Sequence, residues 1–204
     1  MSRLLLVRHG ETELKSSLRY WGRSDVALSD LGIRQAELLR ERLHPEKIDL
    51  IYSSNLQRAL VTAQIIIGKR NLDITACLEL REIDFGQLEG LTFDEINRLY
   101  PEVARMWLEQ APALTYPGGE SLTEMDKRVQ RFKSRLDGQS NEATVLIVAH
   151  AGVLRTLVCQ LMGLESRQRW QIRLDLASLT IIETYPESAI LTLLNDVSHL
   201  AERS

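Results

Sequence analysis

The sequence predicts an α/β protein with three layers, in which helices cover both faces of a mainly parallel central sheet. Two observations lead to this prediction. Short runs rich in leucine and β-branched residues, typical of buried strands, alternate along the chain with longer segments whose apolar residues recur every three or four positions, as in amphipathic helices. Strands that alternate with helices in this way form parallel sheets covered on both faces.

Length and composition predict a single domain over residues 1–204. With 44% hydrophobic and 26% charged residues, a chain of 204 residues can build one substantial core and is short for two. The net charge of −3 and the isoelectric point near 5.9 leave no general basic surface of the kind that binds nucleic acid or an anionic membrane. We therefore expect neither partner, and any attraction for an anion must be local.

The cysteines and the hydropathy pattern point to the cytoplasm. Cys77 and Cys159 lie in apolar surroundings without the spacing of a metal site, which favours small core residues in a reducing compartment. The apolar run near the N-terminus is too short for a signal peptide, and no stretch approaches the roughly 18 apolar residues that a membrane span needs.

Six segments have the pattern of strands. The first four are short apolar runs, and the last two flank a turn at 186–188 that opens on a proline, as in a β-hairpin. In chain order the expected strands are 3–7, 50–52, 74–80, 144–149, 179–185 and 189–194.

Five segments have the period of helices. Ser29 can cap the first, whose apolar positions Ile33, Ala36, Leu39 and Leu43 would face the core. The other four begin or end at a capping residue, a capping box, a proline or a glycine. They are expected from Asn55 to the stop at Gly68, from Pro101 to Gln110, from Ser121 to about Leu136 before Gly138, and from Val153 to Met162 before Gly163.

Residue types that hold phosphate follow several of these strands. Ligands of open α/β sheets gather beyond the carboxyl ends of the strands. The residues found there are Arg8, His9 and Gly10 after the first strand, Arg58 one turn into the helix after the second, Glu82 after the third, and His150, Ala151 and Gly152 after the fourth. A histidine at a strand end, with a guanidinium before it and a glycine after it, is a candidate nucleophile.

Each candidate also has a structural interpretation. The Arg-His-Gly motif at the first strand end is weak alone, because short motifs recur by chance, and it gains weight from His150 at a second strand end. Arg58 could pair with a surface carboxylate, and Glu82 could cap a turn. Trp107 and Trp170 could line a pocket, although core packing is the more common role for tryptophan at such positions.

Six ordered blocks of the sequence resemble the histidine phosphatase superfamily in its phosphoglycerate mutase-like branch. The blocks extend over nearly the whole chain and lie at 6–12, 22–36, 52–63, 80–90, 117–121 and 148–152. Six blocks in one order do not arise by chance. The resemblance implies the phosphoglycerate mutase-like fold and an enzyme that transfers phosphoryl groups.

The resemblance also implies a role for each catalytic candidate. His9 would attack the phosphorus of a small phosphorylated substrate and form a phosphohistidine, while Arg8, Arg58 and His150 would surround the phosphoryl oxygens. Glu82 would first donate a proton to the leaving group and then accept one from water. Further substrate-binding positions are implied at Gly10, Gly22, Ala151 and Gly152. No metal ion and no other cofactor is implied.

Two positions depart from the pattern of the superfamily. Many relatives have asparagine six residues after the nucleophilic histidine, where this chain has Lys15. Its ammonium group could reach a phosphate oxygen or point to solvent, and we treat Lys15 as a candidate binding residue. Ala151 stands where relatives often have glycine, which matters little if the backbone N–H makes the contact.

The substrate is the less determined part of the prediction. Between Glu82 and Ser121 the only basic residues are Arg98 and Arg105, which favours hydrolysis over a mutase that must hold a second anionic group. Blocks 80–90 and 117–121 resemble alpha-ribazole phosphatases, so alpha-ribazole 5'-phosphate, from cobalamin biosynthesis, is the expected substrate. Phosphoserine or a broad range of small phosphoesters is the alternative. An inactive binding module is disfavoured because every catalytic position is filled.

Two structural expectations complete the prediction. The segment at about 92–121, with Tyr100, Trp107 and Tyr116, is expected to form a cap over the site, with an exposed packing surface as the alternative. Members of the superfamily often dimerise, and the terminal hairpin could supply the edge for a homodimer.

Overall fold

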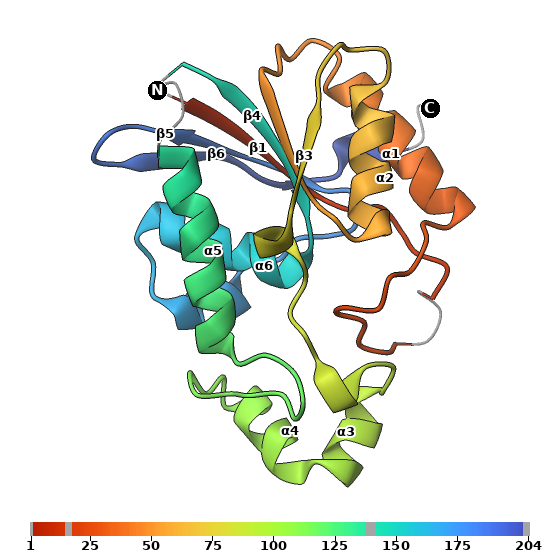
Figure 1. The fold of residues 1–204 in the computed structure, drawn as a ribbon, viewed down its shortest axis with the longest axis vertical. Coiled ribbons are helices and arrows are strands. Elements are labelled where there is room, and N and C mark those ends of the chain that lie inside the picture. Colours follow the sequence, from red (N-terminus) through yellow and green to blue (C-terminus); the bar gives the residue numbers. More distant parts are fainter. Residues whose placement is uncertain (1, 15–17, 138–141, 202–204) are drawn as a thin grey trace.

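The chain folds around one six-stranded sheet with the strand order β3-β2-β4-β1-β5-β6 (Figure 1). A computed structural model describes residues 2–14, 18–137 and 142–201. The strands are β1 (Ser2–Arg8), β2 (Leu50–Ser54), β3 (Ile74–Cys77), β4 (Thr144–Ala149), β5 (Leu179–Thr184) and β6 (Ala189–Asp196). The strand pairs β1–β4, β2–β4 and β2–β3 are parallel, and β5 runs antiparallel to both β1 and β6. The mainly parallel sheet and the terminal hairpin are therefore confirmed.

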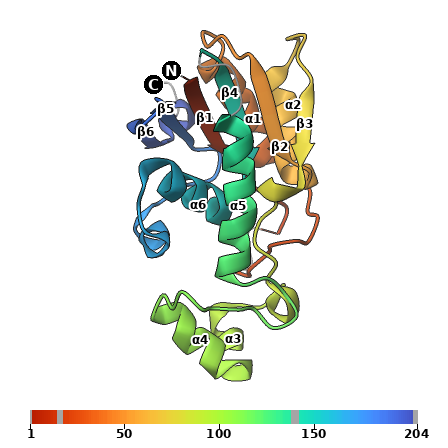
Figure 2. The same cartoon turned by 60° about the vertical axis from the view of Figure 1, so that its left-hand side comes forward.

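Helices cover both faces of the sheet, as predicted. They are α1 (Asp30–Arg42), α2 (Gln57–Ile67), α3 (Phe93–Leu99), α4 (Pro101–Leu108), α5 (Leu122–Asp137) and α6 (Ala151–Met162). The helices α1 and α2 lie on one face, and α5 and α6 lie on the other (Figures 1 and 2). A hydrophobic core lies on each face of the sheet, and alternate residues of β1 belong to different cores. Leu5 and Val7 pack with α1 and α2, while Leu4 and Leu6 pack with α5 and α6.

Several predicted helix boundaries are confirmed by their capping contacts. The hydroxyl of Ser29 accepts a hydrogen bond from the Gly32 N–H at 3.1 Å. At the start of α5, the Glu124 N–H donates to Ser121 Oγ at 3.1 Å, and the Ser121 N–H donates to Glu124 Oε2 at 2.8 Å. Gly163 ends α6 in the left-handed conformation that favours glycine, with φ of 65°. Gly138, the expected end of α5, lies outside the described residues.

The third strand is shorter than predicted. It ends at Cys77, and residues 78–80 form a turn of 3₁₀ helix instead of continuing the strand to Leu80. The reason is the length of its partner, because β3 lies at the sheet edge and pairs only with β2, which ends at Ser54 opposite Cys77. Beyond that pair the backbone has no strand to bind, and the chain turns toward Glu82.

Two details of the helix predictions were wrong, and one helix was missed. The second helix begins at Gln57, because the Asn55 side chain accepts a hydrogen bond from Arg81 Nε at 2.6 Å instead of capping the helix. Ile33 faces solvent and is 39% exposed, since Gly32 and Ala36 occupy the face of α1 that packs inward. The helix predicted from Pro101 is present as α4, but the short helix before it, α3, which is opened by a capping box at Thr92, was not predicted.

The helices α3 and α4 lie at one end of the molecule, beyond the sheet (Figure 2). They belong to the segment 92–121, where a cap is predicted. Its Trp107 and Tyr116 rings pack against Tyr20 and Phe85, with ring centroids 4.7 to 5.7 Å apart. The cap function stays a prediction that these contacts do not test.

Three further expectations concern the surface and the cysteines. Cys77 and Cys159 are buried and unpaired, as expected for core residues. Within the part of the chain that the structure describes, no helix combines the length and the hydropathy needed to cross a bilayer. Strand β6 forms one edge of the sheet, and the homodimer suggested for this edge stays a prediction.

The close packing of α1 against the loop after β1 generates a stability prediction. A methyl group added at Gly32 would lie 2.0 Å from the Glu11 carbonyl oxygen, a backbone atom that cannot rotate away. Gly32→Ala would gain about 1 kcal/mol of helix propensity at an open site. Here overpacking outweighs that gain, and we expect a net loss of about 1 kcal/mol or more in the free energy of unfolding.

Urea unfolding measures this loss, with Glu37→Ala on the exposed face of the same helix as the control. The control is expected to change stability by less than about 0.5 kcal/mol. A Gly32→Ala protein as stable as the original chain would contradict the packing argument.

Candidate active site

The site lies where β1, β2 and β4 end on the same edge of the sheet. His9 follows β1, and its N–H donates to the Ala149 carbonyl at the end of β4 at 3.0 Å. Arg58 extends from the first turn of α2, and His150 precedes the first residue of α6. A cavity of about 480 Å³ opens here, and its lining includes Arg8, His9, Arg58, Glu82 and Ala151. The tertiary structure thus brings together residues from four predicted strand ends.

His9 has the properties of a nucleophile. Its Nδ1 lies 2.7 Å from the Gly10 carbonyl oxygen, which can only accept, so the proton is on Nδ1 and the lone pair is on Nε2. Burial holds the pKa of the imidazole well below its usual 6.5, and the charges of Arg58 and Arg8 lower it further. The ring is therefore neutral at neutral pH, with a free lone pair in the cavity.

Arg58 is buried and connects three parts of the site. Its Nε donates to His150 Nδ1 at 3.2 Å, and its two terminal nitrogens donate to the Ser24 and Gly22 carbonyl oxygens at 2.8 and 2.7 Å. Three of its five N–H groups are used in this way, which leaves two for a ligand. Burial lowers the pKa of the guanidinium, but an arginine remains charged at any physiological pH.

His150 is fully buried beside His9, with the two ring centroids 5.0 Å apart. Because its Nδ1 accepts from Arg58, the proton is on Nε2, which donates to Ser54 Oγ at 2.8 Å. Burial and the Arg58 charge hold the pKa of this imidazole well below 6.5 as well. Both ring nitrogens make hydrogen bonds to protein groups, so His150 can bind a phosphoryl oxygen only if one of these hydrogen bonds is broken.

Arg8 keeps part of its hydrogen-bonding capacity unused. One terminal nitrogen donates to the Leu174 carbonyl oxygen at 2.7 Å, whereas the buried Nε has no partner among the described residues. Burial lowers the pKa of this guanidinium too. Two arginines therefore line the cavity next to the neutral His9, and both have N–H groups available for an anion.

The Glu82 side chain lines the same cavity, and both of its carboxyl oxygens accept backbone hydrogen bonds. One oxygen accepts from the Ile83 N–H at 3.0 Å, and the other accepts from the Gly152 N–H at 3.1 Å. A methyl group on residue 152 would lie 2.6 Å from Glu82 Oε1 and would displace the carboxyl group from this position. Glu82, the predicted proton donor, is thus hydrogen-bonded to the start of α6, two residues after His150.

Of the remaining predicted binding positions, Gly10 and Gly22 make hydrogen bonds to other parts of the protein. The Gly10 N–H donates to Thr62 Oγ1 at 3.2 Å, and the Thr62 hydroxyl donates to the Arg58 carbonyl oxygen at 2.7 Å. The Gly22 N–H donates to Glu89 at 2.9 Å and its carbonyl accepts from Arg58, so both of its polar groups have protein partners. Lys15 lies outside the described residues. The binding roles of these positions stay predictions.

Several charged residues in and around the site were missed from the sequence, among them Arg155 and Glu89. Arg155 lines the cavity one turn along α6 from Ala151, and its buried Nε has no partner among the described residues. The four-residue spacing from Ala151 was the available signal, because it places both on one helix face. Glu89 binds the backbone N–H groups of Gly22, Arg23 and Ser24, a role without any local sequence signal.

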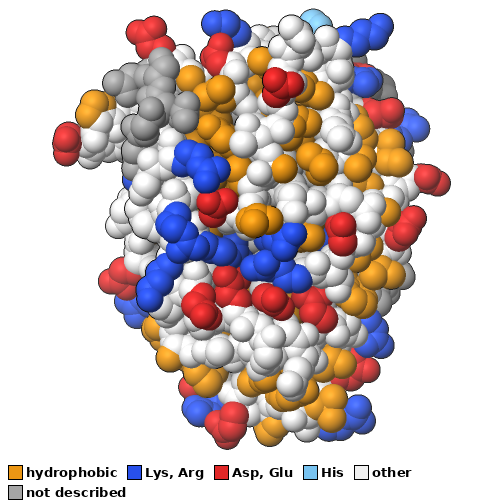
Figure 3. All heavy atoms as spheres, viewed as in Figure 1, with side chains coloured by type: hydrophobic (Ala, Val, Ile, Leu, Met, Phe, Trp, Pro, Cys, Tyr) orange, Lys and Arg blue, Asp and Glu red, His pale blue; other side chains and the backbone are white. Residues whose placement is uncertain are grey.

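Positive charge gathers on part of the surface, as expected for a chain whose net charge is −3. Figure 3 shows lysine and arginine side chains gathered in a band across the middle of one face, with acidic side chains directly beneath them. This band lies between the sheet and the end of the molecule formed by α3 and α4. In the described ranges 2–14, 18–137 and 142–201, no group of three or more His, Cys, Asp or Glu side chains is arranged to hold a metal ion.

Comparison with known proteins decides the family. The model of the histidine phosphatase superfamily, branch 1, matches residues 4–197. The chain belongs to this superfamily. It is therefore a phosphomonoester hydrolase of the histidine phosphatase type with the phosphoglycerate mutase-like fold, and its substrates are small phosphorylated metabolites.

Relatives of this histidine phosphatase include phosphoserine phosphatases and alpha-ribazole phosphatases. Phosphoserine phosphatase 1 of Hydrogenobacter thermophilus is 35% identical over 99% of this chain and 96% of its own length. The alpha-ribazole phosphatase of Shigella flexneri has a similar structure, with a TM-score of 0.89 and 31% identity, covering 95% of this chain and 96% of that one. A phosphoserine phosphatase variant of Entamoeba histolytica in complex with phosphoserine aligns with a TM-score of 0.88 and 29% identity, covering 98% of this chain and 100% of that one.

The buried neutral histidines of this phosphatase predict a loss of stability in acid. The unfolded chain protonates each histidine as the pH falls through about 6.5, whereas the folded chain resists protonation because its pKa values are lower. The unfolded state thus binds more protons below 6.5, and the folded state loses up to about 1.4 kcal/mol per pH unit for each histidine.

We expect His150→Gln to remove one such contribution. Its free energy of unfolding, measured in urea between pH 7 and pH 5, should fall less steeply than that of the original chain. His44→Gln, at an exposed histidine, is the control and should keep the original slope. Equal slopes for all three proteins would show that His150 titrates normally in the folded state.

Proposed function

We propose that this phosphatase hydrolyses its substrate in two steps through a phosphohistidine on His9. His9 Nε2 forms a bond to phosphorus while the bond to the ester oxygen breaks, and the leaving oxygen takes a proton from the Glu82 carboxyl group. The resulting carboxylate then removes a proton from water, which attacks the phosphohistidine and releases phosphate. Arg8 and Arg58 bind the phosphoryl oxygens, and His150 holds Arg58 in place.

One observation carries this proposal: a neutral imidazole with a free Nε2 lone pair lies in a cavity beside two arginines with unused N–H groups. A protonated imidazole could not attack phosphorus, and the same two charges that would bind the phosphoryl group also lower the pKa of His9. Proton transfer by a positioned carboxyl group contributes a factor of about 10² to 10⁴ in rate. The neutral imidazole, the two arginine charges and the positioned carboxyl group all favour the same reaction, phosphoryl transfer to His9.

Turnover of p-nitrophenyl phosphate in the presence of EDTA tests the reaction. We expect hydrolysis to continue in the chelator, since the arginines supply the positive charge. His9→Ala should abolish both turnover and acid-labile labelling of the protein by substrate phosphate, because no other group can accept the phosphoryl group. His44→Ala is the matched control and should keep both. Labelling that survives in His9→Ala would refute His9 as the nucleophile.

For the substrate, we propose alpha-ribazole 5'-phosphate. The cavity has an aromatic side formed by Tyr20, Phe85, Trp107 and Tyr116, in which the Phe85 and Trp107 rings are stacked with centroids 5.7 Å apart. Aromatic surfaces of this kind bind flat bases through stacking. A volume of about 480 Å³ leaves space for a nucleoside beyond the phosphoryl group. The likeness to the Shigella flexneri alpha-ribazole phosphatase supports the same substrate.

Phosphoserine is the second candidate, and Arg155 is the observation that favours it. The buried Nε of Arg155 has no partner among the described residues, and its charge interacts with Glu82 across the cavity. A guanidinium at this place could bind the carboxylate of a phosphorylated amino acid. The similarity to the Hydrogenobacter thermophilus phosphoserine phosphatase 1 supports this alternative.

The two substrates are distinguished by kcat/KM with a pair of reciprocal variants. For alpha-ribazole phosphate we expect kcat/KM at least about tenfold above that for phosphoserine, equal to about 1.4 kcal/mol of transition-state preference. Trp107→Ala should lower the value for alpha-ribazole phosphate by about tenfold through lost stacking, of about 1–3 kcal/mol, and Arg155→Met should spare it.

Leu108→Ala, at a residue of α4 that is 69% exposed, controls for disturbance of the helix. If phosphoserine is preferred by about tenfold and Arg155→Met removes that preference, the alpha-ribazole proposal fails and the second candidate replaces it.

A further inference from the structure

The segment 117–121, one of the blocks that identify the family, has no part in the mechanism so far. Its backbone packs against the turn that follows Glu82. The Gln87 N–H donates to the Pro117 carbonyl oxygen at 2.8 Å, and the Glu120 N–H donates to the Asp84 carbonyl oxygen at 2.9 Å. A methyl group on residue 119 would lie 2.3 Å from the Asp84 carbonyl oxygen, so only glycine allows the two turns to meet.

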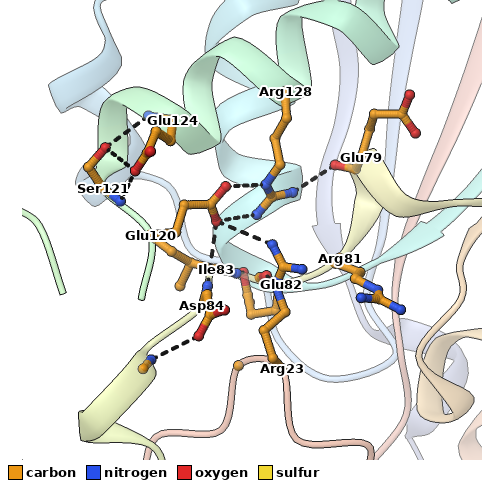
Figure 4. Close-up of polar contacts among 12 residues, drawn as sticks. Arg23, Glu79, Arg81, Glu82, Ile83, Asp84, Glu120, Ser121, Glu124 and Arg128 are labelled. Carbon is orange, nitrogen blue, oxygen red and sulfur yellow. Dashed lines mark hydrogen bonds and ion pairs between the residues drawn. The ribbon is translucent and has the colours of Figure 1, made fainter. Parts of the chain in front are cut away.

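The Glu120 carboxylate is the centre of a buried polar cluster beside this contact. Arg128 of α5 donates to it from Nε at 2.6 Å and from Nη2 at 2.9 Å, and Arg128 is only 6% exposed. The Asp84 N–H donates to Glu120 Oε2 at 3.4 Å, and Arg23 Nη2 lies 3.7 Å from the same oxygen. Figure 4 shows the guanidinium groups of Arg128 and Arg23 both directed at the Glu120 carboxylate. One carboxylate therefore joins α5, the turn after Glu82 and the loop that contains Arg23.

Arg23 extends this cluster to the predicted proton donor. Its Nε donates to the Glu82 carbonyl oxygen at 3.0 Å, while its other end faces Glu120. The flanking residues Gly22 and Ser24 accept hydrogen bonds from Arg58 through their carbonyl oxygens. The same three-residue loop thus touches the phosphate-binding arginine on one side and the backbone of Glu82 on the other.

We propose that Glu120 is a positioning residue for Glu82, with Arg23 as the link. This inference rests on the proposed role of Glu82 as proton donor. The backbone around Glu82 is held at two points, the Glu82 carbonyl by Arg23 and the Asp84 N–H and carbonyl by Glu120. Proton transfer needs the donor within hydrogen-bond reach of the leaving oxygen, and a displacement of about 1 Å can cost about 10²-fold in rate. Neither Glu120 nor Arg23 touches the reacting atoms in this scheme.

A positioning role has a signature that general damage to the fold lacks. An alkyl ester, such as phosphoserine or alpha-ribazole phosphate, needs a proton on its leaving oxygen. p-Nitrophenyl phosphate releases p-nitrophenolate, a stable anion, and its leaving oxygen needs almost no help from a proton donor. A misplaced Glu82 should therefore slow the alkyl ester selectively, whereas a disturbed phosphate site should slow both substrates equally.

The experiment compares kcat/KM for p-nitrophenyl phosphate and for whichever of the two alkyl esters the original chain hydrolyses better. This parameter reports the step in which the leaving group departs. We expect Glu120→Gln and Arg23→Met to lower kcat/KM for the alkyl ester by about 10- to 100-fold and that for the aryl ester by less than about threefold. Glu124→Gln, at an exposed carboxylate that contacts only the start of α5 in the close-up, should change neither.

Glu120→Gln removes one member of a buried ion pair and can prevent folding. Arg23→Met leaves the Arg128–Glu120 pair intact and tests the link alone. An equal loss on both esters, or no loss on either in the folded variants, would overturn the proposal.

A double variant separates this proposal from the one on which it rests. In a Glu82→Gln background, Arg23→Met should cause no further loss on the alkyl ester, because there is no proton donor left to position. Losses that multiply would overturn the positioning role. If Glu82→Gln itself lowers both esters equally, the assignment of Glu82 as proton donor fails instead.

Discussion

The buried guanidinium of Arg58 is the interaction on which the rest of the site depends. It binds His150 and the carbonyl oxygens of Gly22 and Ser24, and so connects α2 to the end of β4 and to the loop beside Glu82. Burial lowers the pKa of both histidines, and the charge of Arg58 lowers it further. A charge buried in this way is costly unless its hydrogen bonds are satisfied, and two loop carbonyls and His150 accept from three of its five N–H groups. The positive centre that would bind phosphate therefore adds to the effect of burial in keeping His9, the proposed nucleophile, unprotonated.

The parallel pairing of β1 with β4 gives this arrangement its geometry. Arg8 lies opposite Ala149 in the register, so the residues that follow, His9 and His150, leave the sheet side by side. A shift of one residue in this pairing would turn the alternating side chains to the wrong faces. The register is held on both faces by core residues of β1, which makes the spacing of the two histidines a consequence of ordinary hydrophobic packing.

Next to His9 and Arg58, the cavity has one aromatic and one cationic side. The aromatic side comes from the loop before α1, from the turn at Phe85 and from the segment 92–121, whereas Arg155 comes from α6, a helix of the central layers. The residues of the proposed reaction and those that would recognise the leaving group thus lie in different parts of the chain. A fold of this kind supports one reaction on many leaving groups, because segments at the strand ends can change without disturbing the sheet.

Local patterns in the sequence determined the alternation of strands and helices, the caps at Ser29 and Ser121, and the strand-end positions of His9, Arg58 and His150. Each depends on periodicity or on neighbours within a few residues. Only the tertiary structure decided where β3 ends, which face Ile33 takes, and that Arg155 and Glu120 lie near Glu82. These features depend on partners dozens of residues away, such as the end of β2 for β3 and the turn at Asp84 for Glu120. No local pattern encodes such distant contacts, because they form only when the layers pack.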